Sequence, residues 1–306
     1  MNQRGPIFIG GLSHSGKTEM RMILEQHPDI TMVRRTTMWD RFYGAFGDLQ
    51  RSENLERCLS ALVAAEGLRA FEIDPSRLRR EFKAGPPTYA RLFGLIHQQR
   101  ADRLRKQRWG EQLGMLESFA DPIFESFEHA RMIHLIRHPQ ARYAEAMARS
   151  GHRKRGALGA DVAEWLNSAG LAERNRRLYP EQYHVIRYEE LAADPVGAAR
   201  AVCLFLAEQP TEKMVELARS IISHREDVIP VAGSERRSPT SPSFESAFVD
   251  KYASTALHNL RYPIVDRSRC MRGMSAFPIH WSINRMTMGA WRVAQGRNNN
   301  RLVRSS

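Results

Sequence analysis

The residues best suited to chemistry form one short loop near the start of the chain. They fit the phosphate-loop pattern G-x-x-x-x-G-K-S/T and read Gly11-Leu12-Ser13-His14-Ser15-Gly16-Lys17-Thr18. Glycines let the backbone of such a loop curl, so that successive N–H groups face one anion. The amino group of Lys17 and the hydroxyls of Ser15 and Thr18 can donate to the same anion. The loop therefore predicts a binding site for a phosphate-like group.

Arginines, not acids, follow the later strand candidates of this chain. ATPases and kinases with such a loop hold Mg²⁺ through an acid at the end of a second strand. Here the two candidate strand ends are Ile136-Arg137 and Ile186-Arg187. An arginine beside a phosphate loop suits a second phosphate. The pattern favours a nucleotide with anionic groups at two places and no metal, although the complete Gly-Lys-Thr ending keeps an Mg-ATP-dependent P-loop kinase open.

A phosphate loop needs a strand before it and a helix after it, and the flanking sequence predicts both. Residues 6–9 are apolar and β-favouring, and they run into Gly10-Gly11, which is typical of a buried strand followed by a tight turn. Met20, Ile23 and Leu24 then recur on one face of a helix. We expect this helix to end at His27-Pro28.

The rest of the chain alternates strand and helix candidates. Residues 132–136 and 182–186 are apolar, strand-like runs, whereas residues 38–108 are charged and helical in pattern. Helices are also expected over residues 141–150 and 195–207. Strands that alternate with long helical stretches predict an α/β fold, with a central parallel sheet flanked by helices.

Composition places the chain among globular proteins. Of its 306 residues, 42% are hydrophobic and 26% are charged, which excludes a disordered or a membrane-embedded chain. We find neither a secretory signal nor an apolar run of the roughly 18 to 20 residues that span a bilayer. The three widely spaced cysteines, Cys58, Cys203 and Cys270, exclude a disulfide framework and suit a reducing compartment. We therefore expect a cytoplasmic protein.

Positive charge is concentrated at the C-terminus. The formal net charge is +12, and residues 267–306 contain eight Arg and no Asp or Glu. We therefore divide the chain into one domain over residues 1–266 and a basic, helical segment over residues 267–306. This segment could act as a lid, pack on the domain, or contact an anionic membrane surface. We expect no nucleic acid as a partner.

Four short motifs, in this order and spacing, resemble the sulfotransferase family that uses 3′-phosphoadenosine 5′-phosphosulfate (PAPS). The resemblance covers roughly residues 5–210. Its elements are the loop with the helix that ends at His27-Pro28, then Arg108-Trp109-Gly110-Glu111, Arg137-His138-Pro139 with a helix behind it, and Arg187-Tyr188-Glu189-Glu190-Leu191 followed by Asp194-Pro195. Each motif is short, but four in order are specific.

The resemblance implies a P-loop NTPase-like sulfotransferase fold and transfer of a sulfuryl group from PAPS to a hydroxyl or amine. The loop would cradle the 5′-phosphosulfate, Arg137 and Arg149 would hold the 3′-phosphate, and Tyr188 would lie near the adenine. The residues expected to bind the nucleotide are Ser13, His14, Ser15, Gly16, Lys17, Thr18, Arg137, Arg149 and Tyr188. The acceptor is left open among carbohydrates, peptides, lipids and small metabolites.

Catalysis of this transfer needs cations on the transferred group and a base for the acceptor proton. We assign the charge to Lys17 and His14, and the base to His14 or to Glu111. Two simpler interpretations stay open, in which His14 only forms a hydrogen bond in the loop and Glu111 is a structural anion paired with an arginine.

Several positions depart from the family's pattern and leave a nucleotide-binding relative without catalysis as a further alternative. The family carries Arg or Lys where this chain has His14, and Thr where it has Lys17. Some members place a glutamate base in the stretch that holds Arg34 and Arg35 here. The remaining departures are Gln112 in place of Lys, and Glu145 in place of the serine that holds the 3′-phosphate.

Overall fold

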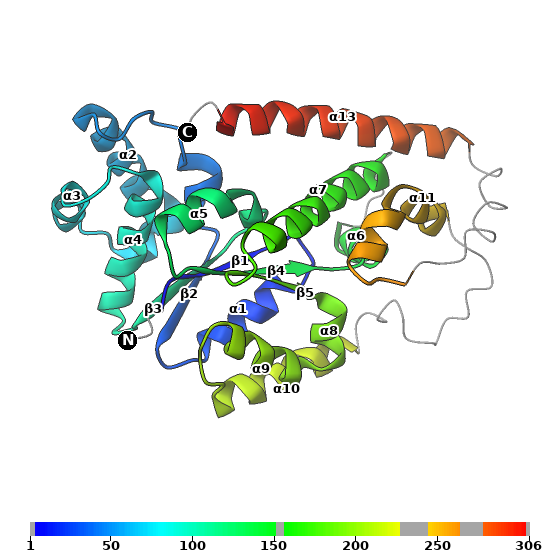
Figure 1. Cartoon of the computed structure of the whole chain (residues 1–306), viewed down its shortest axis with the longest axis horizontal. Coiled ribbons are helices and arrows are strands. Elements are labelled where there is room, and N and C mark those ends of the chain that lie inside the picture. The colour runs from blue at the N-terminus through cyan, green and yellow to red at the C-terminus, as the bar shows by residue number, and fades with distance from the viewer. Residues whose placement is uncertain (1–3, 151–155, 227–243, 264–277, 304–306) are drawn as a thin grey trace.

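A parallel sheet forms the centre of the computed structural model, which describes residues 4–150, 156–226, 244–263 and 278–303 (Figure 1). Its five strands are ordered β2-β3-β1-β4-β5, and every pairing is parallel. They are β1 (Ile7–Gly10), β2 (Ile30–Arg34), β3 (Arg108–Gln112), β4 (Arg131–Ile136) and β5 (Tyr183–Arg187). The predicted α/β class and the strands β1, β4 and β5 are confirmed, and β2 and β3 are additional.

Helices cover both faces of the sheet. Figure 1 shows α1 (Lys17–Glu25), α8 (Tyr188–Ala193), α9 (Pro195–Phe205) and α10 (Glu212–Glu226) on one face. On the other side lie α4 (Tyr89–Arg103), α5 (Ala120–Ser126), α6 (Pro139–Ser150), α7 (Ala157–Leu178) and α11 (Phe244–Asn259), with α13 (Pro278–Val303) on the outside of α7.

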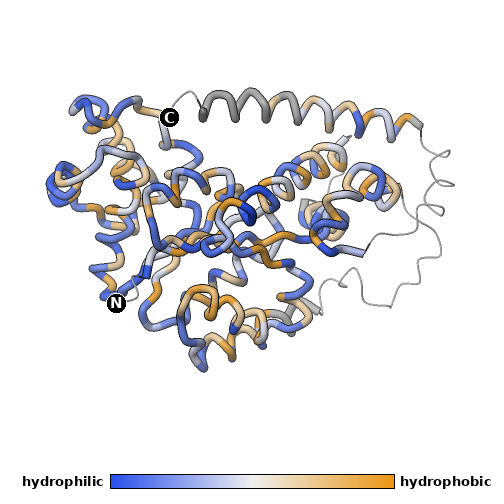
Figure 2. The backbone as a smooth tube through the Cα atoms, in the orientation of Figure 1, coloured by the Kyte–Doolittle hydropathy of each residue, from blue (hydrophilic) through white to orange (hydrophobic). Residues whose placement is uncertain are grey.

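The strands supply alternate side chains to the two faces. Ile7 and Ile9 pack with α1, α9 and α10, whereas Phe8, between them, packs with the helical segment of residues 38–127. Figure 2 shows this apolar character along the central strands and along α9. Because both faces are buried, β1, β2 and β4 are largely apolar along their length.

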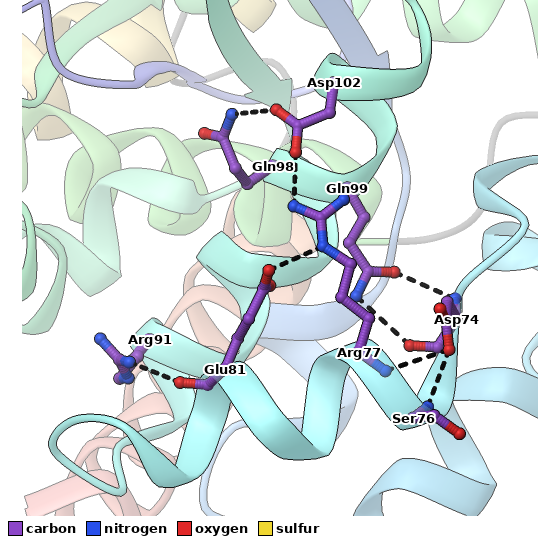
Figure 3. Close-up of polar contacts among 8 residues, drawn as sticks. All are labelled: Asp74, Ser76, Arg77, Glu81, Arg91, Gln98, Gln99 and Asp102. Atoms are coloured by element: carbon purple, nitrogen blue, oxygen red, sulfur yellow. Dashed lines mark hydrogen bonds and ion pairs between the residues drawn. The ribbon is translucent and has the colours of Figure 1, made fainter.

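A helical subdomain stands at the β2 end of the sheet. It contains η1 (Met38–Phe42), α2 (Ser52–Ala64), η2 (Glu66–Phe71), α3 (Pro75–Lys83) and α4. Its exposed face is tied by a polar network (Figure 3), in which Asp74 caps α3 by accepting from the backbone N–H groups of Ser76 and Arg77. The Arg77 side chain then bridges Glu81 on α3 and Asp102 on α4.

The C-terminal helix α13 lies along α7 (Figure 1). The Gly159 N–H on α7 donates to Asn284 Oδ1 at 2.8 Å, and a Cβ at Gly159 would lie only 1.9 Å from the Asn284 carbonyl oxygen. A glycine is therefore what lets the two helices approach. Residues 278–303 of the basic segment are helical, whereas residues 267–277 and 304–306 lie outside the described residues. No helix in the described ranges is both long and apolar enough to cross a membrane.

Candidate functional site

The phosphate loop joins β1 to α1 and lies at the carboxyl end of the sheet. Gly11 and Gly16 have φ values of 117° and 92°, which glycine adopts without strain. Space demands glycine as well, because a Cβ at Gly11 would lie 2.1 Å from the Leu135 carbonyl oxygen, and one at Gly16 would lie 2.7 Å from the Tyr188 ring. The loop is thus pressed between β4 and the start of α8.

Lys17 is the loop's principal cation. Its side chain is buried, and the ammonium donates to the Gly11 carbonyl oxygen. Burial lowers the pKa of Lys17 to about 8, although Glu117 acts in the opposite direction. Among the described residues, no side chain caps the N-terminus of α1, so the backbone N–H groups of its first turn are left to donate to an anion. At neutral pH the loop therefore presents a charged ammonium and backbone donors to an anion.

A cleft of about 440 Å³ opens in front of the loop. Basic side chains dominate its wall, with Glu19 as the one carboxylate among the described residues that line it. The lining residues are Ser13, His14, Gly16, Lys17, Thr18, Glu19, Arg35, Gln112, Gly114 and Arg149. Ser15 is absent from this wall, because its hydroxyl is buried and donates to the Leu12 carbonyl oxygen at 2.6 Å. Ser15 thus stabilises the loop from inside.

Glu145 is held between the two arginines that were expected to bind the 3′-phosphate. Arg137 donates to Glu145 Oε2, and Arg149 Nη2 lies 3.0 Å from Glu145 Oε1. One carboxylate between two guanidinium groups leaves a net positive charge. Arg137 is buried, whereas the Arg149 side chain is 57% exposed and lines the cleft. Arg149 is therefore the member of this cluster that a ligand can reach first.

Tyr188 packs its ring against the guanidinium of Arg137. The guanidinium carbon lies 4.2 Å from the centroid of the Tyr188 ring, in a cation–π contact. Arg137 also donates to the His14 carbonyl oxygen at 3.1 Å. The arginine is thereby joined to the phosphate loop, and the structure brings Lys17, Arg137, Arg149 and Tyr188 together as one assembly.

His14 stands at the cleft wall between the loop and Glu145. Its Nδ1 lies 3.7 Å from Glu145 Oε1. Burial lowers the pKa of His14 below its usual value, and nearby arginines act in the same direction, against the attraction of Glu145. In the free protein at neutral pH, the ring is therefore neutral and able to accept a proton.

Glu111 lies in β3, outside the wall of the cleft. Its side chain is fully buried, accepts a hydrogen bond from the Thr36 hydroxyl, and lies 3.0 Å from His97 Nε2. Its partners are thus a threonine and a histidine rather than an arginine. The next residue, Gln112, does line the cleft. The catalytic role of Glu111 stays a prediction.

Glu117 is a buried carboxylate beneath the loop that the sequence motifs did not reveal. Its Oε2 accepts from the Gly11 N–H at 2.7 Å, and its Oε1 accepts from Ser168 at 2.9 Å. His134 Nε2 lies 3.3 Å from the same Oε1 atom. Glu117 belongs to the short helix η3 (Leu116–Phe119). Only the tertiary fold brings it under Gly11, so no local pattern marked it.

Among the described residues, no group of three or more His, Cys, Asp or Glu side chains is arranged to hold a metal ion. Glu117 and Glu145, two carboxylates beside the loop, are each engaged with protein donors. The expectation that the reaction needs no metal stays a prediction.

A family model described as the sulfotransferase family matches residues 6–212. The chain is similar to the solved sulfotransferase domain of the Synechococcus PCC 7002 olefin synthase, with 17% identity and a TM-score of 0.54, over 87% of this chain and 98% of that one. It is also similar to the sulfotransferase domain from the curacin biosynthetic pathway, with 15% identity and a TM-score of 0.53, over 87% of this chain and all (100%) of that one. These TM-scores, over 87% of this chain, show a common fold. No curated protein matches the sequence.

Proposed function

The chain belongs to the sulfotransferase family, and on this premise we propose that it moves a sulfuryl group from PAPS to a hydroxyl or amine of an acceptor. The observation that favours PAPS as the donor is that two anion-binding sites lie side by side. The phosphate loop with Lys17 offers one site, and Arg149 with Arg137 behind it offers the other. A nucleotide with a 5′-phosphosulfate and a 3′-phosphate matches this pair of sites.

Lys17 is placed to act on the transferred group. In a loose transition state, negative charge develops on the equatorial and bridging oxygens. A buried ammonium beside backbone N–H groups stabilises such charge more strongly than the same groups do in water. Lys17 also keeps its proton at neutral pH, since its pKa is about 8.

His14 and Glu111 are the two groups proposed to take the acceptor proton. His14 lines the cleft with a neutral ring, which supports a role as the base. Glu111 is fully buried and bonded to Thr36, and its neighbour Gln112 lines the cleft in its place. We therefore place His14 first and keep Glu111 as the second candidate.

An Mg-ATP-dependent kinase is the alternative that the Gly-Lys-Thr ending of the loop favours. Such an enzyme needs an acid at a strand end to hold Mg²⁺. In this fold β2, β4 and β5 lead into or end in arginines, at Arg34-Arg35, Arg137 and Arg187. This arrangement supports the PAPS proposal over the kinase.

The test is transfer of label from PAPS, radiolabelled at sulfur, to a panel of carbohydrate, peptide, lipid and small-metabolite acceptors. We expect transfer to one class by the wild type, and a loss of at least a hundredfold in Lys17→Ala. Lys83→Ala serves as the matched control, since this lysine is exposed on α3. Transfer of γ-phosphate from Mg-ATP in place of sulfuryl would establish the kinase, and PAPS binding without transfer would establish the non-catalytic relative.

A further inference from the structure

We propose that the acceptor carries an anionic group, a carboxylate or a phosphate, in addition to the hydroxyl or amine that is sulfated, and that Arg35 binds this group. The inference rests on the proposed sulfotransferase function and names the chemical class of its acceptor. The inference comes from Arg35, a cation in the cleft that is needed neither for an ion pair within the described part of the fold nor for the proposed binding of the donor.

Arg35 lies at the side of the cleft opposite to the proposed 3′-phosphate site. It follows β2, whereas Arg137 follows β4 and the loop follows β1. In the order β2-β3-β1-β4-β5, β2 is two strand spacings from β1, which is about 10 Å. Arg35 and Arg149 both line the cleft, with Lys17 as the loop's own cation. Arg35 therefore faces the side left for the acceptor.

The backbone holds Arg35 in an uncommon conformation. Its φ is 53°, in the left-handed region that non-glycine residues seldom adopt. Its N–H donates to the Gln112 carbonyl oxygen at 3.1 Å. On the other side, a Cβ at Gly67 would lie 3.0 Å from the Arg35 carbonyl oxygen, so η2 packs closely against it. An uncommon φ fixed from two sides is typical of functional segments.

The neighbouring residue reinforces this placement. Thr36 is fully buried, and its hydroxyl donates to Glu111 in β3 and accepts from the Met38 N–H at 3.3 Å. The residue after Arg35 is therefore anchored in the core. The exposed guanidinium of Arg35 is left to project from a fixed base into the cleft.

No carboxylate among the described residues pairs with the Arg35 guanidinium, although its charge acts on Lys17 through space. Arg137 and Arg149, in contrast, share Glu145. The donor's two anionic ends are also matched without Arg35, by the loop and by the Arg149 side. A guanidinium prefers the paired oxygens of a carboxylate or phosphate. An acceptor with such a group would complete the charge pairing of the cleft.

The test measures binding of three phenols to protein saturated with PAP, the desulfated donor, by isothermal titration calorimetry. The probes share one ring and hydroxyl and differ in one substituent: 4-hydroxyphenylacetate, 4-hydroxybenzylphosphonate and neutral 4-hydroxyphenylacetamide. We expect the wild type to bind at least one anionic probe about tenfold or more tightly than the amide. The order of the two anions then distinguishes a carboxylate from a phosphate.

Arg35→Gln should remove the preference for the anionic probe and leave binding of PAP and of the amide within about twofold. Arg34→Gln is the matched control, because Arg34 is exposed, adjacent and outside the described cleft wall, and it should keep the preference. Absence of a preference in the wild type, whether the probes bind equally or none binds, overturns the inference. An equal loss of all three probes in Arg35→Gln, or weakened PAP, also overturns it.

The PAP titration separates this inference from the function on which it rests. Wild-type protein that does not bind PAP refutes the proposed function and the inference together. Wild-type protein that binds PAP but shows no preference for an anionic probe refutes the inference alone.

Discussion

Glu145 should weaken the binding of the nucleotide that its neighbouring arginines are proposed to recognise. It occupies Arg137 and Arg149 and adds a negative charge beside the proposed 3′-phosphate site. Glu145→Gln keeps the shape and a hydrogen-bond acceptor while it removes the charge. We therefore expect this variant to bind PAP more tightly than the wild type does.

The magnitude follows from the geometry of Arg149. A phosphate that accepts from its exposed N–H groups at about 2.8 Å would lie roughly 5 to 6 Å from the Glu145 carboxylate. Repulsion at that distance is about 3 kcal/mol per unit charge at an effective dielectric constant near 20. Because the Arg149 side chain is 57% exposed, solvent screening reduces this to about 1.4 kcal/mol, or a tenfold gain in affinity.

The assay is calorimetric titration with PAP and with adenosine 5′-phosphate, which lacks the 3′-phosphate. Glu145→Gln should bind PAP about tenfold more tightly and leave the affinity for adenosine 5′-phosphate within twofold. Glu56→Gln is the control, since Glu56 pairs with Arg79 on the surface at 2.6 Å. An unchanged or weaker affinity for PAP, or an equal gain for both nucleotides, would refute the placement of the 3′-phosphate beside Glu145.

Three further predictions concern the base, the pH dependence and the packing of α13. Glu111→Gln should lower kcat with little change in PAP affinity, and an unchanged kcat would remove Glu111 from the candidate bases. Burial lowers the pKa of His138 from 6.5 to about 4, so the folded state disfavours the charged ring and stability is lost as pH falls from about 6.5 to about 4. In chemical denaturation, His138→Gln should reduce the loss of unfolding free energy over that range by about 3 kcal/mol; an identical pH profile would contradict this. Gly159→Ala should destabilise the protein by about 1 to 3 kcal/mol because its Cβ would clash with α13. The control is Gly170→Ala on the same helix, where a Cβ would have nothing within 4 Å, and this change should be neutral or stabilising. Equal effects of the two substitutions would argue against the packing of α13 on α7.

The sequence sufficed for the parts of the site that are local in the chain. The loop and strand β1 are contiguous, and the apolar runs of β4 and β5 place Arg137 and Arg187 at strand ends. Short-range periodicity and turn chemistry determine these features. From these local features the sequence predicted the parallel sheet and the position of Arg137 beside the phosphate loop.

Strand β3 escaped the apolar pattern because it buries the polar residues Arg108, Glu111 and Gln112, and the first two pair with side chains from other elements. Arg108 lies 3.0 Å from Glu208, and Glu111 is paired with His97 and Thr36. Such pairs make a buried charged strand tolerable, but they join segments far apart in the sequence. No window along the chain contains both members of the Arg108–Glu208 pair.

The protonation states and ion pairs of the side chains around the cleft could also be determined only from the tertiary structure. The sequence left His14 as either a cation or a base, and burial, which lowers its pKa, decides for the neutral ring in the free protein. The sequence shows Glu145 only as a departure from the family's pattern, whereas its pairing with Arg137 and Arg149 is seen in the folded structure. Arg142, three residues before Glu145 in the same helix, pairs with Asp161 and Glu164.

Thermal unfolding of the purified wild type with PAP, adenosine 5′-phosphate or Mg-ATP tests the central claim most directly. A ligand at a hundred times its Kd adds about 2.7 kcal/mol to the stability of the folded state. If the site binds the 3′-phosphate, we expect a clear rise in Tm with PAP and a much smaller rise with adenosine 5′-phosphate at the same concentration. A rise with Mg-ATP alone, or equal rises with PAP and adenosine 5′-phosphate, would contradict it.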